Sequence, residues 1–171
     1  MIGTGTETLG ETRVLRKQAL LTHRVVKRNV EGLTQEDSLI QPQPGGNCLN
    51  WVIGHLLYVS DKMLSMLGQT PVLGTDTLKR YGRGTPQLTN AAEAIQLDRL
   101  MAAWDEAAGR LEAGLNAVTS EDLDRPAPFS PTDNPKETVR SLLSLLSFHQ
   151  AYHAGQTGLL RRIAGKPGAV A

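Results

Sequence analysis

Residues 148–156 read Phe148-His149-Gln150-Ala151-Tyr152-His153-Ala154-Gly155-Gln156, and they lie inside the longest uninterrupted helical pattern of the sequence. Residues four apart lie one above the other on a helix, so His149 and His153 can direct their imidazoles at one atom. Both also belong to the apolar face of this helix, whose members recur every three or four residues: Val139, Leu142, Leu146, His149, His153, Gln156 and Leu160. Imidazoles on a buried face need partners, so the spacing is compatible with a metal site, with satisfied core histidines or with exposed histidines.

Flanking signals set the limits of this helix. The stretch Asn134-Pro135-Lys136-Glu137 combines an N-cap residue, a proline suited to the first helical position and a glutamate spaced for a capping box. At the other end, Arg161 and Arg162 suit the last turn, Gly165 follows and Pro167 stops the helix. We therefore expect a helix over residues 134–164.

Three earlier segments have the same helical spacing of apolar residues, at about 11–32, at 47–67 and from Thr89 or Asn90 to about Val118. Residues 68–89 contain four glycines and two prolines without a period, so we expect a connection of about twenty residues there. A link of that length can cross a bundle and start the next helix parallel to the last. The pattern predicts an all-α fold, a four-helix bundle with up-down-down-up topology.

Two short motifs between these helices resemble each other. Thr34-Gln35-Glu36-Asp37 can cap a short turn, and Thr119-Ser120-Glu121-Asp122 has similar turn chemistry. Residues 1–10 are rich in Gly and Thr and have no apolar period, so we expect them to be flexible. With 171 residues, the chain fits a single domain, residues 1–171, that can bury a core without disulfides.

Composition narrows the range of partners. Eighteen basic residues against seventeen acidic ones leave a formal charge of +1, and no basic run is interleaved with aromatics, which argues against a nucleic-acid partner. No signal-peptide pattern and no apolar run long enough for a bilayer is present, so we expect no membrane association. Cys48 is the single cysteine, which excludes an internal disulfide and suits a cytoplasmic location.

A third histidine, His55, lies about two turns into the helix expected at 47–67. On a helical wheel it flanks the main apolar stripe, where it can face a neighbouring helix, and Gly54 beside it would let another backbone come close. Cys48 precedes His55 by seven residues, about 10 Å along a helix, so we expect Cys48 not to share a metal with it. The helix-start position of Cys48 could still lower its pKa.

Two motifs together resemble a known family. Asn47-Cys48-Leu49-Asn50-Trp51-Val52-Ile53-Gly54-His55-Leu56, followed some ninety residues later by His149-Gln150-Ala151-Tyr152-His153-Ala154-Gly155-Gln156, is similar to the DinB/YfiT-like metalloenzymes. The resemblance covers nearly the whole chain, including the long connection. It implies an up-down-down-up bundle in which His55, His149 and His153 bind one divalent metal.

The resemblance also implies an activity and an assembly. Relatives include transferases that attach small molecules to low-molecular-weight thiols such as bacillithiol, so a thiol co-substrate and a small-molecule electrophile are expected. Three neutral imidazoles suit zinc or nickel, and a thiol bound to such an ion becomes a thiolate. The alternatives are a non-catalytic metal-binding stress-response protein and a metal-dependent hydrolase. We also expect a homodimer, because Cys48, Val52 and Val59 form a second apolar arc beyond the main stripe.

Other residues could support the expected metal site. Gln156 lies one turn beyond His153 and could orient a ligand or serve only as a polar residue of helix packing. Trp51 and Tyr152 could line a pocket or belong to the core. No acid follows Glu137 on the last helix, which favours thiol activation over hydrolysis; Asp98 and Asp105 of the preceding helix remain candidate bases. The fourth histidine, His23, lies among charged residues and is expected to be a solvated surface imidazole.

Overall fold

The computed structural model describes residues 5–169, and these form helices and loops without a β-strand. Four helices are long: α1 (Gly5–Val30), α3 (Leu49–Met66), α5 (Leu97–Ala117) and α7 (Val139–Ile163). Three are short: α2 (Gln35–Leu39), α4 (Thr75–Leu78) and α6 (Ser120–Asp124). Two 3₁₀ turns, η1 (Lys79–Tyr81) and η2 (Ala91–Glu93), complete the described secondary structure. The all-α fold class is therefore confirmed, while the up-down-down-up order stays a prediction.

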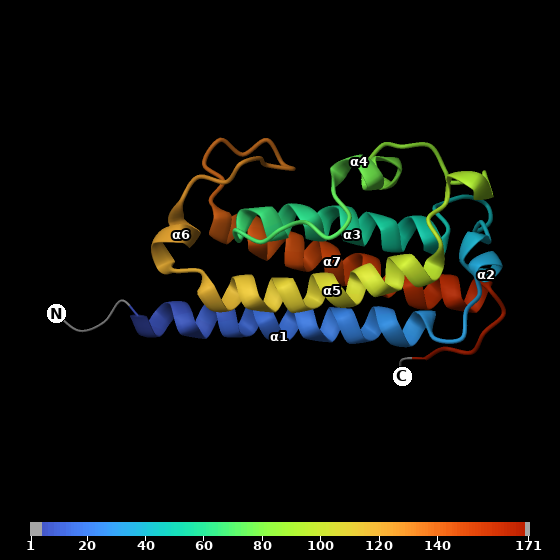
Figure 1. Cartoon of the computed structure of the whole chain (residues 1–171), viewed down its shortest axis with the longest axis horizontal. Helices are drawn as coiled ribbons and strands as arrows, with labels where there is room; N and C mark the ends of the chain where they lie inside the picture. The colour runs from blue at the N-terminus through green and yellow to red at the C-terminus, as the bar shows by residue number, and fades with distance from the viewer. Residues whose placement is uncertain (1–4, 170–171) are drawn as a thin grey trace.

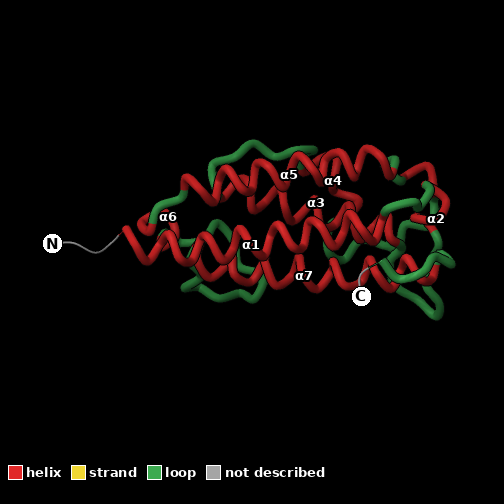
Figure 2. The backbone as a smooth tube through the Cα atoms, turned by 90° about the horizontal axis from the view of Figure 1, so that it is seen from below, coloured by secondary structure: helices red, strands yellow, loops and turns green. Residues whose placement is uncertain are grey.

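The four long helices lie along one axis and form a bundle (Figure 1). Helix α1 packs against α5 and α7, and α3 packs against the same two helices from the other side. Figure 2 shows the bundle from below, and in this view α1 runs between α5 and α7. Every long helix therefore has two neighbours, and the space that they enclose holds the core. None of the described helices combines the length and the apolarity that a bilayer crossing requires.

Helix α3 is the most deeply buried element of the bundle. Only three of its eighteen residues fall outside the buried class, because it contacts α5, α7 and the segment that carries α4 and η1. The apolar arc of Cys48, Val52 and Val59 is covered within the chain itself, with exposed fractions of 0, 2 and 7%. This arc is therefore core and leaves no surplus surface, so our sequence-based reason for a homodimer was wrong.

The starts of three long helices differ from the sequence-based expectation by more than two residues, and α3 begins two residues later than expected, at Leu49. Helix α1 begins at Gly5 instead of about Glu11, because a helix can extend by backbone hydrogen bonds where no apolar face guides it. Residues 1–4, part of the stretch expected to be flexible, lie outside the described residues. Asn90 caps only the 3₁₀ turn η2, and α5 begins at Leu97 after an extended Ala94.

Helix α7 begins at Val139, four to five residues later than the expected start at Asn134-Pro135. Its N-cap is Thr138, which forms a capping box with Ser141. Thr138 also pairs with Pro126 in an isolated antiparallel bridge, because Ala127 N–H donates to Glu137 O and Val139 N–H donates to Arg125 O, and residues 135–136 form a turn before it. The end of α7 agrees closely with the prediction, with Ile163 as its last residue and Gly165 at φ +76°.

The connection over residues 67–96 contains more structure than expected. It includes α4, η1 and η2, and it lies along the outside of α3 (Figure 1). Asp61 of α3 fixes its first part, since the buried carboxylate accepts hydrogen bonds from Val72, Leu73 and Gly74 N–H at 2.6, 3.2 and 2.8 Å. Tyr81, fully buried, fixes its centre.

Candidate metal centre

The structure brings together three of the four histidines. His55 Nε2 of α3 lies 3.2 Å from His149 Nε2 of α7, and His153 Nε2 lies 3.1 Å from the same nitrogen. One ligand atom from each ring falls within 4.8 Å of the other two. Nitrogens bound about 2.1 Å from a tetrahedral ion lie roughly 3.4 Å from one another, so these side chains could hold a metal ion.

Hydrogen bonds to the far side of two rings fix their tautomers. His55 Nδ1 donates to the backbone carbonyl of Tyr81 at 2.7 Å, and His153 Nδ1 donates to Gln156 Oε1 at 2.7 Å. A neutral imidazole carries one N–H, so the Nε2 atoms of both rings keep a lone pair directed at the shared point. Such partners commonly orient histidines that bind a metal.

His149 has one ring nitrogen that the described residues leave unpaired. Its Nδ1 is buried and has no hydrogen-bond partner among the described residues. Its Nε2 faces two lone pairs and must carry the hydrogen to bond either of them, which leaves Nδ1 as an unpaired acceptor. A cation at the shared point would accept all three Nε2 lone pairs, so the donor set fits a divalent metal.

The electrostatics favour neutral rings. Burial, and after it the nearby His153 and His55, lowers the pKa of His149 from 6.5 to about 4. Burial also lowers the pKa of His55, against the effect of the Tyr81 carbonyl, and the pKa of His153, against the effect of Gln156. All three imidazoles are therefore neutral and able to bind a metal at pH 7.

The fold positions His55 through the connection outside α3. The Tyr81 ring lies against Gly54, where a Cβ would fall 2.1 Å from Tyr81 Cδ1. The Tyr81 hydroxyl donates to Asn50 Oδ1 and accepts from Ile95 N–H, at 3.0 and 2.7 Å. We had expected Gly54 to admit another backbone, but an aromatic ring uses the space. Tyr81 was missed by the sequence interpretation, and the pair Leu78 and Tyr81 in a polar segment was its only signal.

The three histidines line a cavity of about 800 Å³. Its walls come from α3, α7, the loop over residues 42–47, the connection near Gly84 and the loop that carries Phe129. Lys62 and Arg83 supply positive charge, and among the described lining residues there is no carboxylate. The Lys62 ammonium lies 4.5 Å from the ring centre of Tyr58 and 4.9 Å from that of Phe129. The cavity is therefore open to a small molecule and attractive to an anion.

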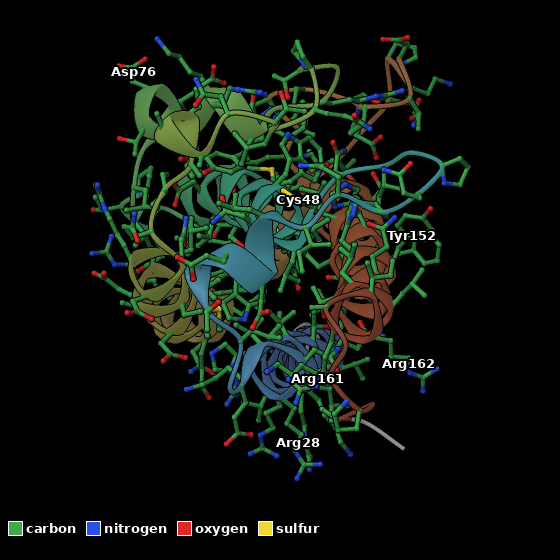
Figure 3. The ribbon with its side chains drawn as sticks, turned by 90° about the vertical axis from the view of Figure 1, so that its right-hand side faces the viewer. Arg28, Cys48, Asp76, Tyr152, Arg161 and Arg162 are labelled. Carbon is green, nitrogen blue, oxygen red and sulfur yellow. The ribbon has the colours of Figure 1, made fainter. Side chains whose placement is uncertain are left out.

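The residues expected around the site have different positions. Trp51 stacks on His55, with ring centres 4.8 Å apart and an interplanar angle of 10°, and it lines the cavity. Gln156 lines the same cavity through its contact with His153. Tyr152 is 59% exposed and points away from the bundle (Figure 3). Its ring only touches the edge of His153, at 5.2 Å between centres, so Tyr152 does not line the cavity.

The candidate bases on α5 lie elsewhere. Asp105 contacts His23 Nε2 at 2.8 Å and Lys27 Nζ at 3.0 Å, and Asp98 lines a separate surface depression beside Lys27. Neither lines the histidine cavity. His23 itself is only 15% exposed and stacks on Trp104, so the expectation of a solvated surface imidazole was wrong.

Cys48 lies at the N-cap of α3 inside the bundle and takes no part in the histidine cluster (Figure 3). Burial raises the pKa of its thiol, against the hydrogen bonds that it receives from Trp51 and Gln41. The helix-start position could have lowered this pKa, but the effect of burial is the larger one. Complete burial makes Cys48 a core residue.

Comparison with known proteins agrees with this architecture. The crystal structure of a conserved protein from Enterococcus faecalis is similar, with a TM-score of 0.68 over 91% of this chain and 98% of the other. At 18% identity, that likeness concerns the fold alone. A comparison with curated proteins gave no match. The DinB superfamily matches residues 18–157, a range that includes all three clustered histidines. The chain therefore belongs to the DinB superfamily.

Proposed function

We propose that this protein is a metal-dependent transferase that conjugates a low-molecular-weight thiol to a small electrophile. The observation that carries the proposal is the convergence of His55, His149 and His153 Nε2 in an open cavity without a lining carboxylate among the described residues. Three neutral nitrogen ligands match a catalytic zinc site, in which a fourth position is left for substrate. Zinc or nickel is the expected ion.

The absence of an acid among the described lining residues separates two chemistries. Hydrolysis at a histidine site typically uses a glutamate as the base that activates water. A thiol needs no such base, because a divalent ion, when bound, lowers the pKa of a coordinated thiol far enough to form the thiolate. Transfer then forms one sulfur–carbon bond, breaks the bond to the leaving group and releases the thiol proton to solvent.

Lys62 and Arg83 indicate the charge of the substrates. Both side chains line the cavity that the histidines share. The buried inner wall of that cavity has a low dielectric constant, which strengthens the attraction of these two cations for an anion. Low-molecular-weight thiols of the bacillithiol type carry carboxylates, which these cations would hold at the rim. Trp51 and Phe129 offer flat apolar surfaces for the electrophile.

We also propose that the protein is a homodimer that pairs through α7. Four large apolar residues of this helix are exposed, with fractions of 67, 59, 61 and 38%: Phe148, Tyr152, Leu159 and Ile163. Their spacing of four, seven and four residues puts them on one stripe of the helix. An exposed apolar stripe of this kind is typical of a protein–protein interface.

The activity is tested with protein purified without an affinity tag. Conjugation of 1-chloro-2,4-dinitrobenzene is followed with bacillithiol, glutathione, mycothiol and 2-mercaptoethanol, using zinc-loaded, nickel-loaded and chelator-treated protein. We expect turnover that depends on metal and favours a carboxylate-bearing thiol. His153→Ala should abolish turnover, whereas His23→Ala, outside the cavity, should keep it. Lys62→Gln should raise the KM for the acidic thiols and leave that for 2-mercaptoethanol unchanged.

Other outcomes would assign another role. Metal binding without turnover of any thiol would indicate a non-catalytic metal-binding protein, of the stress-response type that the family name suggests. Metal-dependent cleavage of an ester or amide in the same protein would indicate a hydrolase.

A further inference from the structure

A second cavity, of about 420 Å³, lies between the helices of the bundle, apart from the three clustered histidines; the fourth histidine, His23, belongs to its lining. It opens between α1 and α5, which lie side by side in Figures 1 and 2, and reaches inward to Met63 of α3 and Gln150 of α7. None of the described residues lines both this cavity and the histidine cavity. On α3, Val59 lines the histidine cavity and its neighbour Ser60 lines the second cavity. On α7, His149 and Gln150 are divided in the same way, so α3 and α7 form the wall between the two cavities.

Small residues create this second cavity. Ala19 on α1 and Ala107, Ala108 and Gly109 on α5 line it, and nothing lies within 4 Å of the place where a Cβ of Gly109 would be. Larger residues further in supply an apolar wall: Met63, Trp104, Leu111 and Leu115. The interior of a bundle is ordinarily close-packed, so a cavity of this size is an unusual feature that a ligand could fill.

Two buried polar atoms of the lining have no partner among the described residues. Gln150 donates through Nε2 to Leu56 O and Ser60 Oγ, at 3.1 and 2.8 Å, but its Oε1 accepts nothing. Arg16 donates through Nη2 to Glu112 Oε1 at 2.9 Å, but its Nε has no acceptor. Gln150 is only 6% exposed. Leaving such groups unpaired is costly, so a ligand that supplies both partners would be stabilised.

The two unpaired atoms need different kinds of hydrogen-bond partner. Arg16 Nε is a cationic donor on the α1 side of the opening and requires an anionic acceptor, while Gln150 Oε1 at the inner end requires a donor. The opening is also positive, because the described lining residues include Arg13, Arg16 and Lys17 but only one acid, Glu112. The nearby Asp105 is already paired with His23 and Lys27.

We propose that this second cavity binds a small amphipathic hydroxy acid. Its carboxylate pairs with Arg16 and the neighbouring Arg13 and Lys17, its apolar body lies against Met63, Trp104 and Leu111, and its hydroxyl donates to Gln150 Oε1. The inference does not depend on the transferase activity, because none of the described residues lines both cavities.

The test is calorimetric titration of the full chain with three eight-carbon probes: 8-hydroxyoctanoate, octanoate and 1,8-octanediol. We expect one molecule of 8-hydroxyoctanoate per chain. Octanoate should bind about fivefold more weakly, which is the effect of one lost hydrogen bond. The neutral diol should bind at least tenfold more weakly, because it has no charge for the arginines.

Variants assign the site. The double variant Arg13→Gln/Lys17→Gln changes two exposed side chains and should weaken both acids about tenfold. The matched control Arg24→Gln/Arg162→Gln removes the same charge from exposed residues outside the lining and should bind normally. Gln150→Leu should remove the preference for 8-hydroxyoctanoate over octanoate.

A carboxylate could also bind at the histidines, and the same titration separates the two sites. Binding at the second cavity should persist in chelator-treated protein and in His153→Ala. Affinity that is lost in those two samples and kept in Arg13→Gln/Lys17→Gln would place the acid at the histidines and overturn the proposal. The absence of heat from any probe at millimolar concentration would overturn it as well.

Discussion

The ring of Tyr81 lies against Gly54, so closely that a Cβ at position 54 would be 2.1 Å from Tyr81 Cδ1. The backbone carbonyl of Tyr81 accepts a hydrogen bond from Nδ1 of His55, the residue after Gly54, at 2.7 Å. Because the same residue fills the space over α3 and fixes the imidazole tautomer, the packing of the connection and the geometry of the candidate metal site are linked.

Gly54→Ala should therefore destabilise the protein. Elsewhere in a helix interior this change is stabilising, but here the new methyl group collides with an aromatic ring, and overpacking costs about 1–3 kcal/mol. Urea unfolding measures the change in free energy. Gly155→Ala on α7 is the control, since no atom lies within 4 Å of that Cβ position, and it should be neutral or stabilising. Equal effects of the two changes would contradict the role given to Tyr81.

Gln156 offers a test of the hydrogen bond behind His153. Its Oε1 accepts from His153 Nδ1 at 2.7 Å, which keeps the Nε2 lone pair directed at His149. Gln156→Leu should weaken zinc binding about 10- to 100-fold, as the loss of such a partner commonly does. Competition with a chromophoric chelator gives the affinity. Gln156→Glu, which retains an acceptor, should bind zinc at least as tightly as the parent protein.

The metal-free protein should lose stability in mild acid. The folded-state pKa of His149 is about 4, below the ordinary 6.5, because burial and the neighbouring His153 and His55 disfavour its charged form. Between pH 6.5 and pH 4 the unfolded chain therefore binds more protons than the folded protein does. The free energy of unfolding is highest above pH 6.5 and falls progressively as the pH is lowered toward 4. His55 and His153 shift in the same direction and add to the effect.

Thermal melting of chelator-treated protein between pH 7.5 and 4.5 measures this dependence. His149→Gln keeps a polar side chain without a group that titrates in this range, so its melting temperature should fall less steeply with acid. A slope equal to that of the parent protein would show that other groups govern the acid response.

Disruption of the exposed stripe on α7 tests the dimer. Phe148 is 67% exposed and lies outside both cavities, so Phe148→Asp should place charge in the proposed interface without touching either site. We expect light scattering to give a dimer for the parent protein and a monomer for the variant at micromolar concentration. Arg162→Asp on the same helix changes charge at an exposed polar residue and serves as the control. A parent protein that is monomeric at this concentration would contradict the proposed homodimer.

Periodic signals predicted the helices well, and tertiary contacts set their starts. The apolar spacing over residues 139–163 gave α7 and the alignment of its two histidines. Asn134-Pro135 looked like a helix start, yet these residues enter a turn that Glu137 N–H closes on Asn134 O. The hydrogen bonds between Ala127 and Glu137 and between Val139 and Arg125 then pair Thr138 with Pro126, so the helix starts only after that bridge. Contacts between residues distant in sequence produce that pairing, and no local pattern reveals them.

The candidate site was predictable where its geometry is helical. His149 and His153 follow from spacing, and the motif around His55 supplied the third ring. The carbonyl of Tyr81 could not be inferred, because it comes from a connection without a period. The two Thr-led motifs at Thr34 and Thr119 do form equivalent capping boxes, since that chemistry involves only residues three apart.

The sharpest test of the metal centre is His153→Ala. His153 Nε2 lies 3.1 Å from His149 Nε2, and removing it leaves two of the three convergent nitrogens. Two imidazoles bind a divalent ion far more weakly than three, so metal retained through gel filtration should fall from about one ion per chain to near zero. Mass spectrometry of tag-free protein measures the ratio. His23→Ala is the matched control, because this imidazole pairs with Asp105 on the α1–α5 side of the bundle and should leave metal content unchanged. The same metal content in His153→Ala and in the parent protein would mean that the three histidines do not form a metal site.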